Sequence, residues 1–319
     1  MRVPLFRFLR STLLGLQALL ALGCSKAPRP LQPIPGSSVS LAPPPGFSPA
    51  PNFSGFVSED GRASILVTEL PAQASESVRT LFVDEATARR HFATQGVQVK
   101  QLESLTADGR SIPVVVGAQH AHGHTFDKWV GLYSGAPTVL ITIQVPVEDA
   151  LPDRVAKDVL ASVKVSPPPS LEQKLSALPF TVVAQPPFRI VDALAGSSIV
   201  MTAGELDVDP ESRQPLIVIA SQLSLPFSSD DLSDVSDQLI AGSHRIKDGV
   251  IDSRDEIMFA GIEGLRVNGR LSNGSTYYHY LALWPGDRFV RLVAILPPGS
   301  SVQAEKAIEE VADSVGFRL

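Results

Sequence analysis

The chain has 319 residues, which is long for one domain and sufficient for two. Hydrophobic residues make up 44% and charged residues 19%, as in a globular protein, and the net charge of −6 argues against nucleic acid as a partner. A single cysteine excludes an intrachain disulfide bond and a Cys-rich zinc or iron–sulfur site.

The first 23 residues have the features of a secretory signal peptide. Three arginines within residues 2–10 precede an apolar run at 11–22 that is too short to span a bilayer. Gly23 then supplies the small residue at which such a signal is cut. We therefore expect residues 1–23 to be absent from the mature chain.

Cys24 directly follows this segment. The four residues Ala21-Leu22-Gly23-Cys24 resemble the lipobox of bacterial lipoproteins. The resemblance implies that the Cys24 thiol carries a lipid that anchors the chain to a membrane. Because Ser25 and not aspartate follows, we expect the outer membrane, with the protein facing the periplasm. The alternative is an ordinary secretory signal with an incidental cysteine.

Prolines dominate the next segment. Residues 24–52 show no helical or strand periodicity and contain prolines at 28, 30, 33, 35, 43, 44, 45, 49 and 51. This composition is typical of an extended, polyproline-like tether. We predict a disordered, lipid-anchored linker over residues 24–52.

Residues 53–165 are predicted to form a first domain. A helix that ends at Gly96 is indicated by apolar residues on one face, namely Val78, Leu81, Phe82, Ala86 and Ala93. A meander of four strands follows, among them the apolar run 139–146 that ends in proline. A closing helix is expected over residues 150–162.

Three histidines alternate within the predicted meander, at His120, His122 and His124. On one straight strand they would face the same way, and imidazoles so arranged can bind copper or zinc. This possibility defines the first candidate site in the sequence.

The second half of the chain favours a different interpretation of these histidines. Its corresponding segment contains Asn273-Gly274, a dipeptide typical of a two-residue hairpin turn. A matching turn at His122-Gly123 would place Ala121 opposite His124, and His120 on the other face opposite Thr125. The three imidazoles would then not converge, and a metal site remains an alternative hypothesis.

A second Pro-rich linker over 166–177 leads to a second predicted domain, residues 178–319. The two halves are similar at an offset of 151, which aligns residues 128–135 with 279–286 and residues 139–146 with 290–297. A helix that begins near Ser228 and ends at Gly242, and a closing helix over 302–314, continue the correspondence. We infer a tandem repeat.

Aromatic residues in the aligned segments alternate at strand spacing, and four of them form the second candidate site: Trp129, Tyr133, Tyr280 and Trp284. One interpretation is packing in the core or between strands. The functional alternative is a binding face where sheet meets helix, because aromatic side chains anchor interfaces.

The order of elements, the Pro-aromatic openings (Pro45-Gly46-Phe47 and Pro187-Phe188) and the Ala-Ser-Val and Asp-Ser-Val endings resemble the PsbP-like superfamily, which includes DcrB-like envelope lipoproteins. The resemblance covers residues 45–165 and 178–319. It implies an α+β fold of two tandem helix–sheet–helix sandwiches with mainly antiparallel sheets, used in binding and assembly. It supplies no catalytic residues.

The sequence lacks the Gly-x-Ser-x-Gly turn of many hydrolases and the glycine-rich loops that bind phosphate. We therefore expect no enzyme and no cofactor, but a binding or scaffold module for an envelope protein partner or a small ligand. Two alternatives stay open, an envelope metal-binding protein that uses the histidine turn and an uncharacterised hydrolase.

Overall fold

The computed structural model describes residues 29–318 apart from 71, 122, 195, 223–230 and 285–287. The signal peptide, Cys24 with the start of the linker, His122 and Ser228 therefore lie outside the described residues. In the part of the chain that is described, no helix has the length and apolar character needed to cross a membrane.

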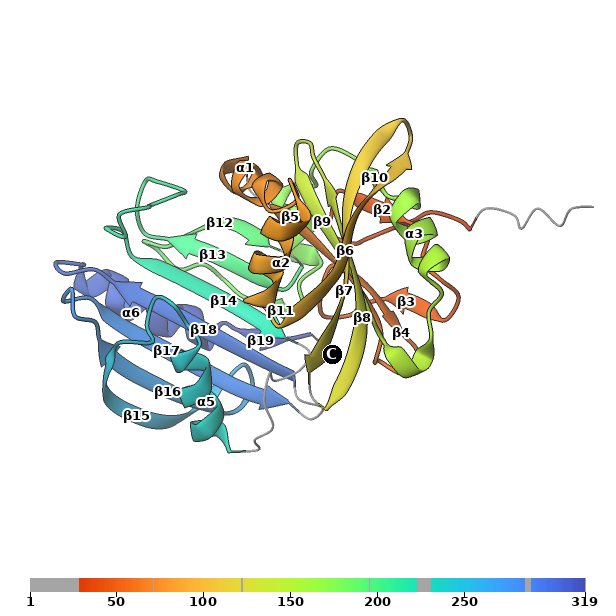
Figure 1. The fold of residues 1–319 in the computed structure, drawn as a ribbon. Coiled ribbons are helices and arrows are strands. Elements are labelled where there is room, and N and C mark those ends of the chain that lie inside the picture. The colour runs from red at the N-terminus through yellow and green to blue at the C-terminus, as the bar shows by residue number, and fades with distance from the viewer. Residues whose placement is uncertain are drawn as a thin grey trace, which may run out of the picture.

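Two seven-stranded antiparallel sheets form the body of the molecule (Figure 1). The first has the order β3-β4-β5-β9-β8-β7-β6 and the second β12-β13-β14-β18-β17-β16-β15. The strands of the first sheet are β3 (Phe47–Pro49), β4 (Gly55–Ser58), β5 (Ser64–Leu70), β6 (Val97–Ala107), β7 (Arg110–Ala121), β8 (His124–Tyr133) and β9 (Thr138–Pro146). Those of the second sheet are β12 (Arg189–Leu194), β13 (Ser198–Thr202), β14 (Leu216–Gln222), β15 (Val250–Phe259), β16 (Ile262–Arg270), β17 (Thr276–Trp284) and β18 (Arg288–Leu296). The two sheets have the same strand order, as the internal repeat predicts.

A small sheet accompanies each large one and extends the correspondence. In the first half, β2 (Val39–Leu41) pairs with β1 (Gln32–Pro33) and with β10 (Lys164–Val165). In the second half, β11 (Phe180–Thr181) pairs with β19 (Gly316–Phe317). We call residues 32–165 the first repeat and residues 180–317 the second repeat.

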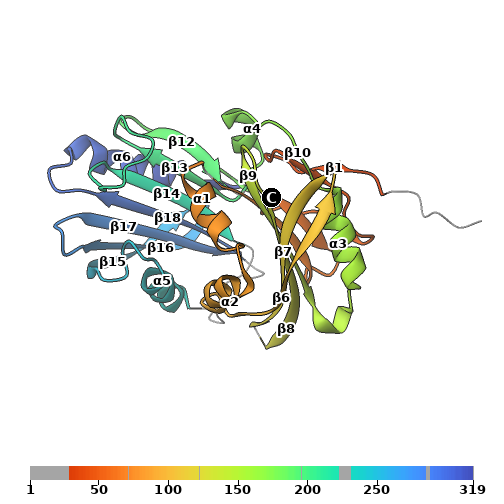
Figure 2. The same ribbon diagram turned by 45° about the horizontal axis from the view of Figure 1, so that its top comes forward.

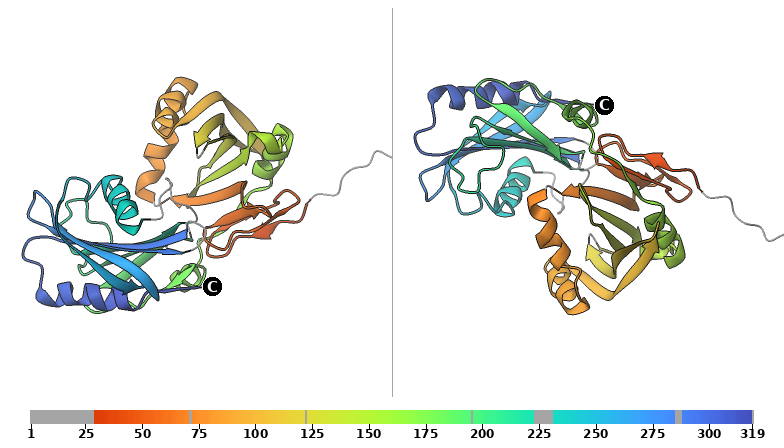
Figure 3. Two further views of the ribbon diagram at one scale, coloured as in Figure 1. Left: turned by 90° about the horizontal axis from the view of Figure 1, so that it is seen from below. Right: turned by 90° about the horizontal axis from the view of Figure 1, so that it is seen from above.

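Helices lie on both faces of each large sheet (Figure 3). In the first repeat, α1 (Ala72–Thr80) and α2 (Glu85–Ala93) cover one face and α3 (Asp153–Ser162) covers the other. In the second repeat, α5 (Leu232–Ala241) and α6 (Val302–Asp313) do the same. The short α4 (Leu171–Ser176) connects the repeats, and the 3₁₀ helix η1 (Val147–Asp149) follows β9. The predicted mainly antiparallel sheets are confirmed, and each sheet has apolar residues on both faces.

The linker predicted over residues 24–52 is too long. Strands β1, β2 and β3 lie within it, and Ile34, Val39 and Leu41 are buried in the core under α3. The prolines stand between or at the ends of these short strands, where a missing N–H costs no ladder hydrogen bond. Proline content therefore concealed a folded segment, and the first repeat begins near residue 32.

The single helix predicted to end at Gly96 is also wrong, because the chain breaks between α1 and α2. Asp84 caps α2 by accepting a hydrogen bond from the Thr87 backbone N–H at 2.7 Å. The break turns Phe82 into the core with Phe92, while Ala86 and Ala93 are exposed.

The turn at Asn273-Gly274 is longer than predicted, because the β16–β17 ladder ends at the pair Arg270–Thr276 and leaves a five-residue loop. The Asn273 side chain accepts a hydrogen bond from the Ser275 backbone N–H at 3.0 Å, which favours the wider turn. In the first repeat the predicted pairs Ala121–His124 and His120–Thr125 are confirmed.

One histidine lies inside the core of the second repeat. His279 on β17 is fully buried beneath α5, where its Nδ1 lies 3.1 Å from Ser236 Oγ, and its Nε2 has no hydrogen-bond partner among the described residues. Burial, together with the positive charges of Arg291 and Arg254, lowers the pKa of His279 well below 6.5. The folded protein therefore keeps this imidazole neutral.

Acid is expected to destabilise the protein through His279. Below about pH 6.5 the unfolded chain takes up a proton that the folded chain refuses, so the free energy of unfolding falls by up to about 1.4 kcal/mol per pH unit until the lower folded pKa is reached. Urea unfolding between pH 7.5 and 5.5 should show this loss in the wild type and in the exposed control His244→Ala, but not in His279→Leu. An unchanged pH slope in His279→Leu would contradict the assignment.

Candidate functional site

The histidine turn brings its described members to opposite faces. His120 Nδ1 lies 3.3 Å from Thr125 Oγ1, whereas His124 Nδ1 lies 3.3 Å from Glu148 Oε1 on η1. His120 and His124 therefore cannot bind one metal ion together. No group of three or more His, Cys, Asp or Glu side chains among the described residues has the arrangement of a metal site.

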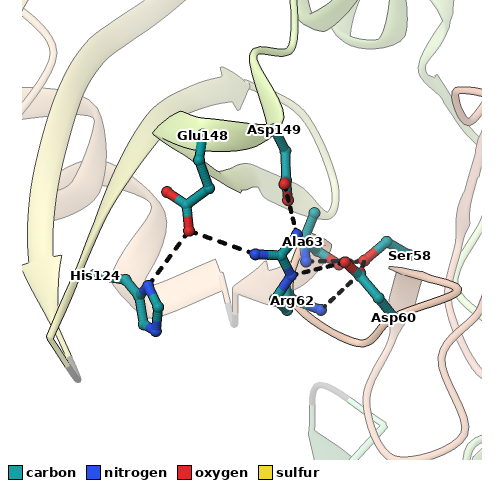
Figure 4. A network of polar contacts seen from close by, with 7 residues as sticks. All are labelled: Ser58, Asp60, Arg62, Ala63, His124, Glu148 and Asp149. Carbon is teal, nitrogen blue, oxygen red and sulfur yellow. Dashed lines mark hydrogen bonds and ion pairs between the residues drawn. The ribbon is translucent and has the colours of Figure 1, made fainter.

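His124 belongs instead to an exposed network of charged groups centred on Arg62 (Figure 4). The Arg62 guanidinium lies 2.8 Å from Asp60, 2.6 Å from Asp149 and 3.4 Å from Glu148. Hydrogen bonds from Ser58 and Arg62 hold the pKa of Asp60 below its usual range. The network joins the β4–β5 hairpin to η1, and its acids are already occupied by a cation from this chain.

The four aromatic candidates do not form one binding face. Trp129 is buried under α3, where its Nε1 donates a hydrogen bond to Asp153 Oδ1 at 2.8 Å, and Tyr280 is buried in the core under α6. Tyr133 and Trp284 stand at matched positions at the ends of β8 and β17. These two residues mark the place where the repeats differ.

A pocket of about 650 Å³ lies at this end of the first repeat, where the β6–β7 hairpin, the β8–β9 loop and β10 meet. Figure 2 shows the hairpin end beside β10 and β1. Among the residues that line the pocket, the buried ones are apolar: Ile112, Leu132 and Val163. Val165 and Tyr133 are partly buried, and the Tyr133 hydroxyl donates a hydrogen bond to the Leu160 carbonyl at 2.6 Å. The volume lies within the range of about 300–1,000 Å³ that is typical of small-molecule sites.

The rim of the pocket consists of exposed polar side chains, namely Asp108, Arg110, Ser111, Ser134 and Lys164. Lys164 forms an ion pair with Asp108, and this hydrogen bond lowers the pKa of the carboxyl group. Arg110 forms no ion pair or hydrogen bond with any described residue, so its guanidinium remains available to a ligand.

The hairpin turn that positions this rim is the same in both repeats. Asp108-Gly109 and Ala260-Gly261 are two-residue turns, and all four residues have positive φ, between 49° and 87°. Turns of this type match the twist of the strands that they join. Because the two turns have the same geometry, they can be superimposed residue by residue, which gives an offset of 152 at this hairpin. Arg110 then corresponds to Ile262, and Ala107 corresponds to Phe259.

In the second repeat an aromatic pair fills the corresponding space. Trp284 stacks on Phe317 with ring centroids 4.6 Å apart and planes 23° apart, and the Arg288 guanidinium lies 5.3 Å from the Phe317 ring centroid. We call Trp284 and Phe317 the aromatic plug. The first repeat has Tyr133 and Val165 at these positions, and the smaller Val165 leaves the end open.

Sequence reasoning identified Tyr133 and missed the other residues of the pocket, above all Arg110, Lys164 and Val165. The signal for them is present in the sequence, because an offset of 152 aligns Val165 with Phe317 and Lys164 with Gly316. It emerges only when the turns and the small sheets fix that alignment.

For the hydrolase alternative, the described residues offer the pair Ser236 and His279, which lie 3.1 Å apart. A serine hydrogen-bonded to a histidine is the arrangement that activates a nucleophile. Both side chains here are 0% exposed, and the free imidazole nitrogen has no carboxylate partner within the described chain. A substrate cannot reach this hydroxyl in the folded state, and the pair serves as a polar contact between α5 and β17.

No family model and no curated protein matches the chain. Among solved structures it is similar to LpqN, involved in cell envelope biogenesis of Mycobacterium tuberculosis, over 44% of this chain and 83% of that one, with 10% identity and a TM-score of 0.33. It is also similar to the apo immunity protein TplEi of the type VI secretion system of Pseudomonas aeruginosa, over 90% of this chain and 96% of that one, with 11% identity and a TM-score of 0.33. A chain of the Tle4–Tli4 complex is similar over 86% of this chain and 98% of that one, with 11% identity and a TM-score of 0.32. Similarity at this level transfers no function to the chain.

Because Phe317 is stacked on Trp284 and Val165 borders a pocket, exchanging these two residue types should affect the stability of the two repeats differently. Phe317→Val removes a stacked ring and should lower the free energy of unfolding by about 1–2 kcal/mol. Val165→Phe places a ring in open space and should change it by less than about 1 kcal/mol. Urea unfolding of both variants measures the difference, and equal destabilisation would show that the first repeat is as closed as the second.

Proposed function

We propose that the chain is a non-catalytic binding lipoprotein of the bacterial cell envelope, and that its first repeat binds a small ligand in the pocket beside β10. The observation that supports this proposal is the difference between the repeats. One fold occurs twice, and the same end has a pocket with a polar rim in the first copy and, among the described residues, the aromatic plug in the second.

The chemistry of the lining favours binding over reaction. The pocket has no histidine or cysteine among its described lining residues, Asp108 is paired with Lys164, and the Tyr133 hydroxyl is engaged with a backbone carbonyl. Burial further raises the pKa of Tyr133, so this phenol keeps its proton. No group in the lining is activated as a nucleophile or poised as a general base.

The second repeat has a structural role in this proposal. Among the described residues, its matching end holds the aromatic plug, and the repeat stabilises the molecule through its own core. We assign both repeats to a tandem PsbP-like, DcrB-like arrangement, on the resemblance of their openings, their endings and their element order.

We further propose that lipid on Cys24 holds the protein at the outer membrane, facing the periplasm. Seven residues separate Cys24 from Gln32, the first residue of β1, and the eight steps between these two residues span at most about 28 Å. The folded part would therefore stay close to the bilayer.

The binding function is tested on protein purified from its own cells in polymer nanodiscs and examined by native mass spectrometry. The wild type is expected to retain a small-molecule adduct, and Val165→Phe to lose it because the added ring fills the pocket. The matched variant Phe317→Val, in the second repeat, should keep the adduct. An adduct retained in full by Val165→Phe would place the binding site elsewhere.

The anchor is tested separately by Cys24→Ser. This variant should move from the membrane fraction to the soluble fraction, because attached acyl chains contribute about 0.8 kcal/mol per buried methylene to membrane binding. Intact-mass measurement of the wild type should show an acylated Cys24 as the first residue. An unacylated amino terminus would contradict the anchor and leave the pocket untouched.

A further inference from the structure

We propose that the pocket of the first repeat takes an anionic amphiphile, with its apolar part on the buried side chains and its anionic group at Arg110 and Lys164. This inference rests on the proposed function and names the ligand class of the same site.

The floor suits an apolar chain or ring. Ile112 and Val163 are each at most 7% exposed, and the partly buried Val165 and Tyr133 complete the apolar lining on this face of the sheet. Leu132 also borders the pocket, but its side chain packs on the opposite face, under α1 and α2. Neither buried side chain on this face, Ile112 or Val163, has a hydrogen-bonding group. A ligand group that reaches this depth gains stability from burial of apolar surface.

The rim suits an anion. It has two cations, Arg110 and Lys164, and one acid, Asp108, so its net charge is positive although that of the whole chain is −6. Asp108 forms its ion pair with Lys164, while Arg110 acts on this carboxylate only through its charge and forms no ion pair or hydrogen bond with any described residue. A planar guanidinium can donate two parallel hydrogen bonds to a carboxylate or a phosphate.

The second repeat has no cation at either of the two matched positions. Ile262 stands at the position of Arg110 and Gly316 at that of Lys164, while Phe317 replaces Val165. The cation at this end of the second repeat, Arg288, lies against the Phe317 ring, at a position that is Pro137 in the first repeat. The joint change indicates a ligand that needs both an apolar space and a positive rim.

The position of the pocket points to the membrane as the source of this ligand. The pocket residues Lys164 and Val165 form β10, which pairs with β2, and β2 pairs with β1 at the start of the described fold. The lipidated cysteine proposed above would thus hold the pocket near the bilayer. Anionic amphiphiles, either fatty carboxylates or lipids with a phosphate headgroup, are abundant there.

The test uses the full chain with Cys24→Ser, so that no attached acyl chain competes for the pocket. The probes are 11-(dansylamino)undecanoic acid and its uncharged methyl ester, whose binding is followed by fluorescence. The acid should bind roughly tenfold more tightly than the ester, the difference expected of a charge-assisted hydrogen bond. Arg110→Ala should remove most of this preference without weakening the ester, whereas Arg154→Ala, at the opposite end of α3, should leave it unchanged.

Competition then distinguishes the two sources of the anionic group. Laurate carries a carboxylate and lysophosphatidylglycerol carries a phosphate headgroup. At least one of these competitors should displace the acid probe. Inorganic phosphate alone should not displace it, because it cannot use the apolar floor. Displacement by phosphate and not by either amphiphile would overturn the proposal.

Other outcomes separate the ligand class from the binding function. Equal binding of acid and ester, unaffected by Arg110→Ala but abolished by Val165→Phe, would refute the anionic class and keep the pocket. Binding that Val165→Phe leaves intact would refute the pocket as well. Absence of binding by both probes, with the native adduct still present, would overturn only the amphiphile. Circular dichroism of each variant shows whether it is folded.

Discussion

Both faces of each large sheet carry apolar side chains, so both faces must be covered. Helices α1, α2 and α3 cover the first sheet, and α5 and α6 cover the second. The closing helices α3 and α6 cover the sheet face but not the end where a hairpin and a two-residue strand meet. Side chains must fill that end, and the whole difference between the repeats depends on how they do so.

In the second repeat the end is filled by Trp284 on Phe317, with Phe259 and Ile262 packed against the same core. In the first repeat the corresponding positions hold Tyr133, Val165, Ala107 and Arg110. These residues are smaller or charged, so the same backbone encloses a pocket. Duplication of one stable fold thus allows the two copies to carry different side chains at the same end. This difference is the basis of the proposed function.

The sequence predicted the elements whose signals are local. Closing helices, the buried strands 139–146 and 290–297, the internal repeat and the pairing of His120 with Thr125 follow from periodicity and turn chemistry. The folded segment 32–49 was missed, because its prolines indicate a tether while its few apolar residues are buried only by contact with distant α3. The pocket was missed for a similar reason, since it is defined by the small size of Val165 and not by any motif.

The most direct measurement is methyl-resolved NMR of the Cys24→Ser chain during titration with the dansylated fatty acid. Val163 and Val315 occupy matched places in the two repeats and in the clusters under α3 and α6, so this pair contains its own control. A ligand in the open end of the first repeat shifts the methyl signals of Val163 and leaves those of Val315 in place. Equal shifts in both repeats, or shifts confined to the second, would contradict the account.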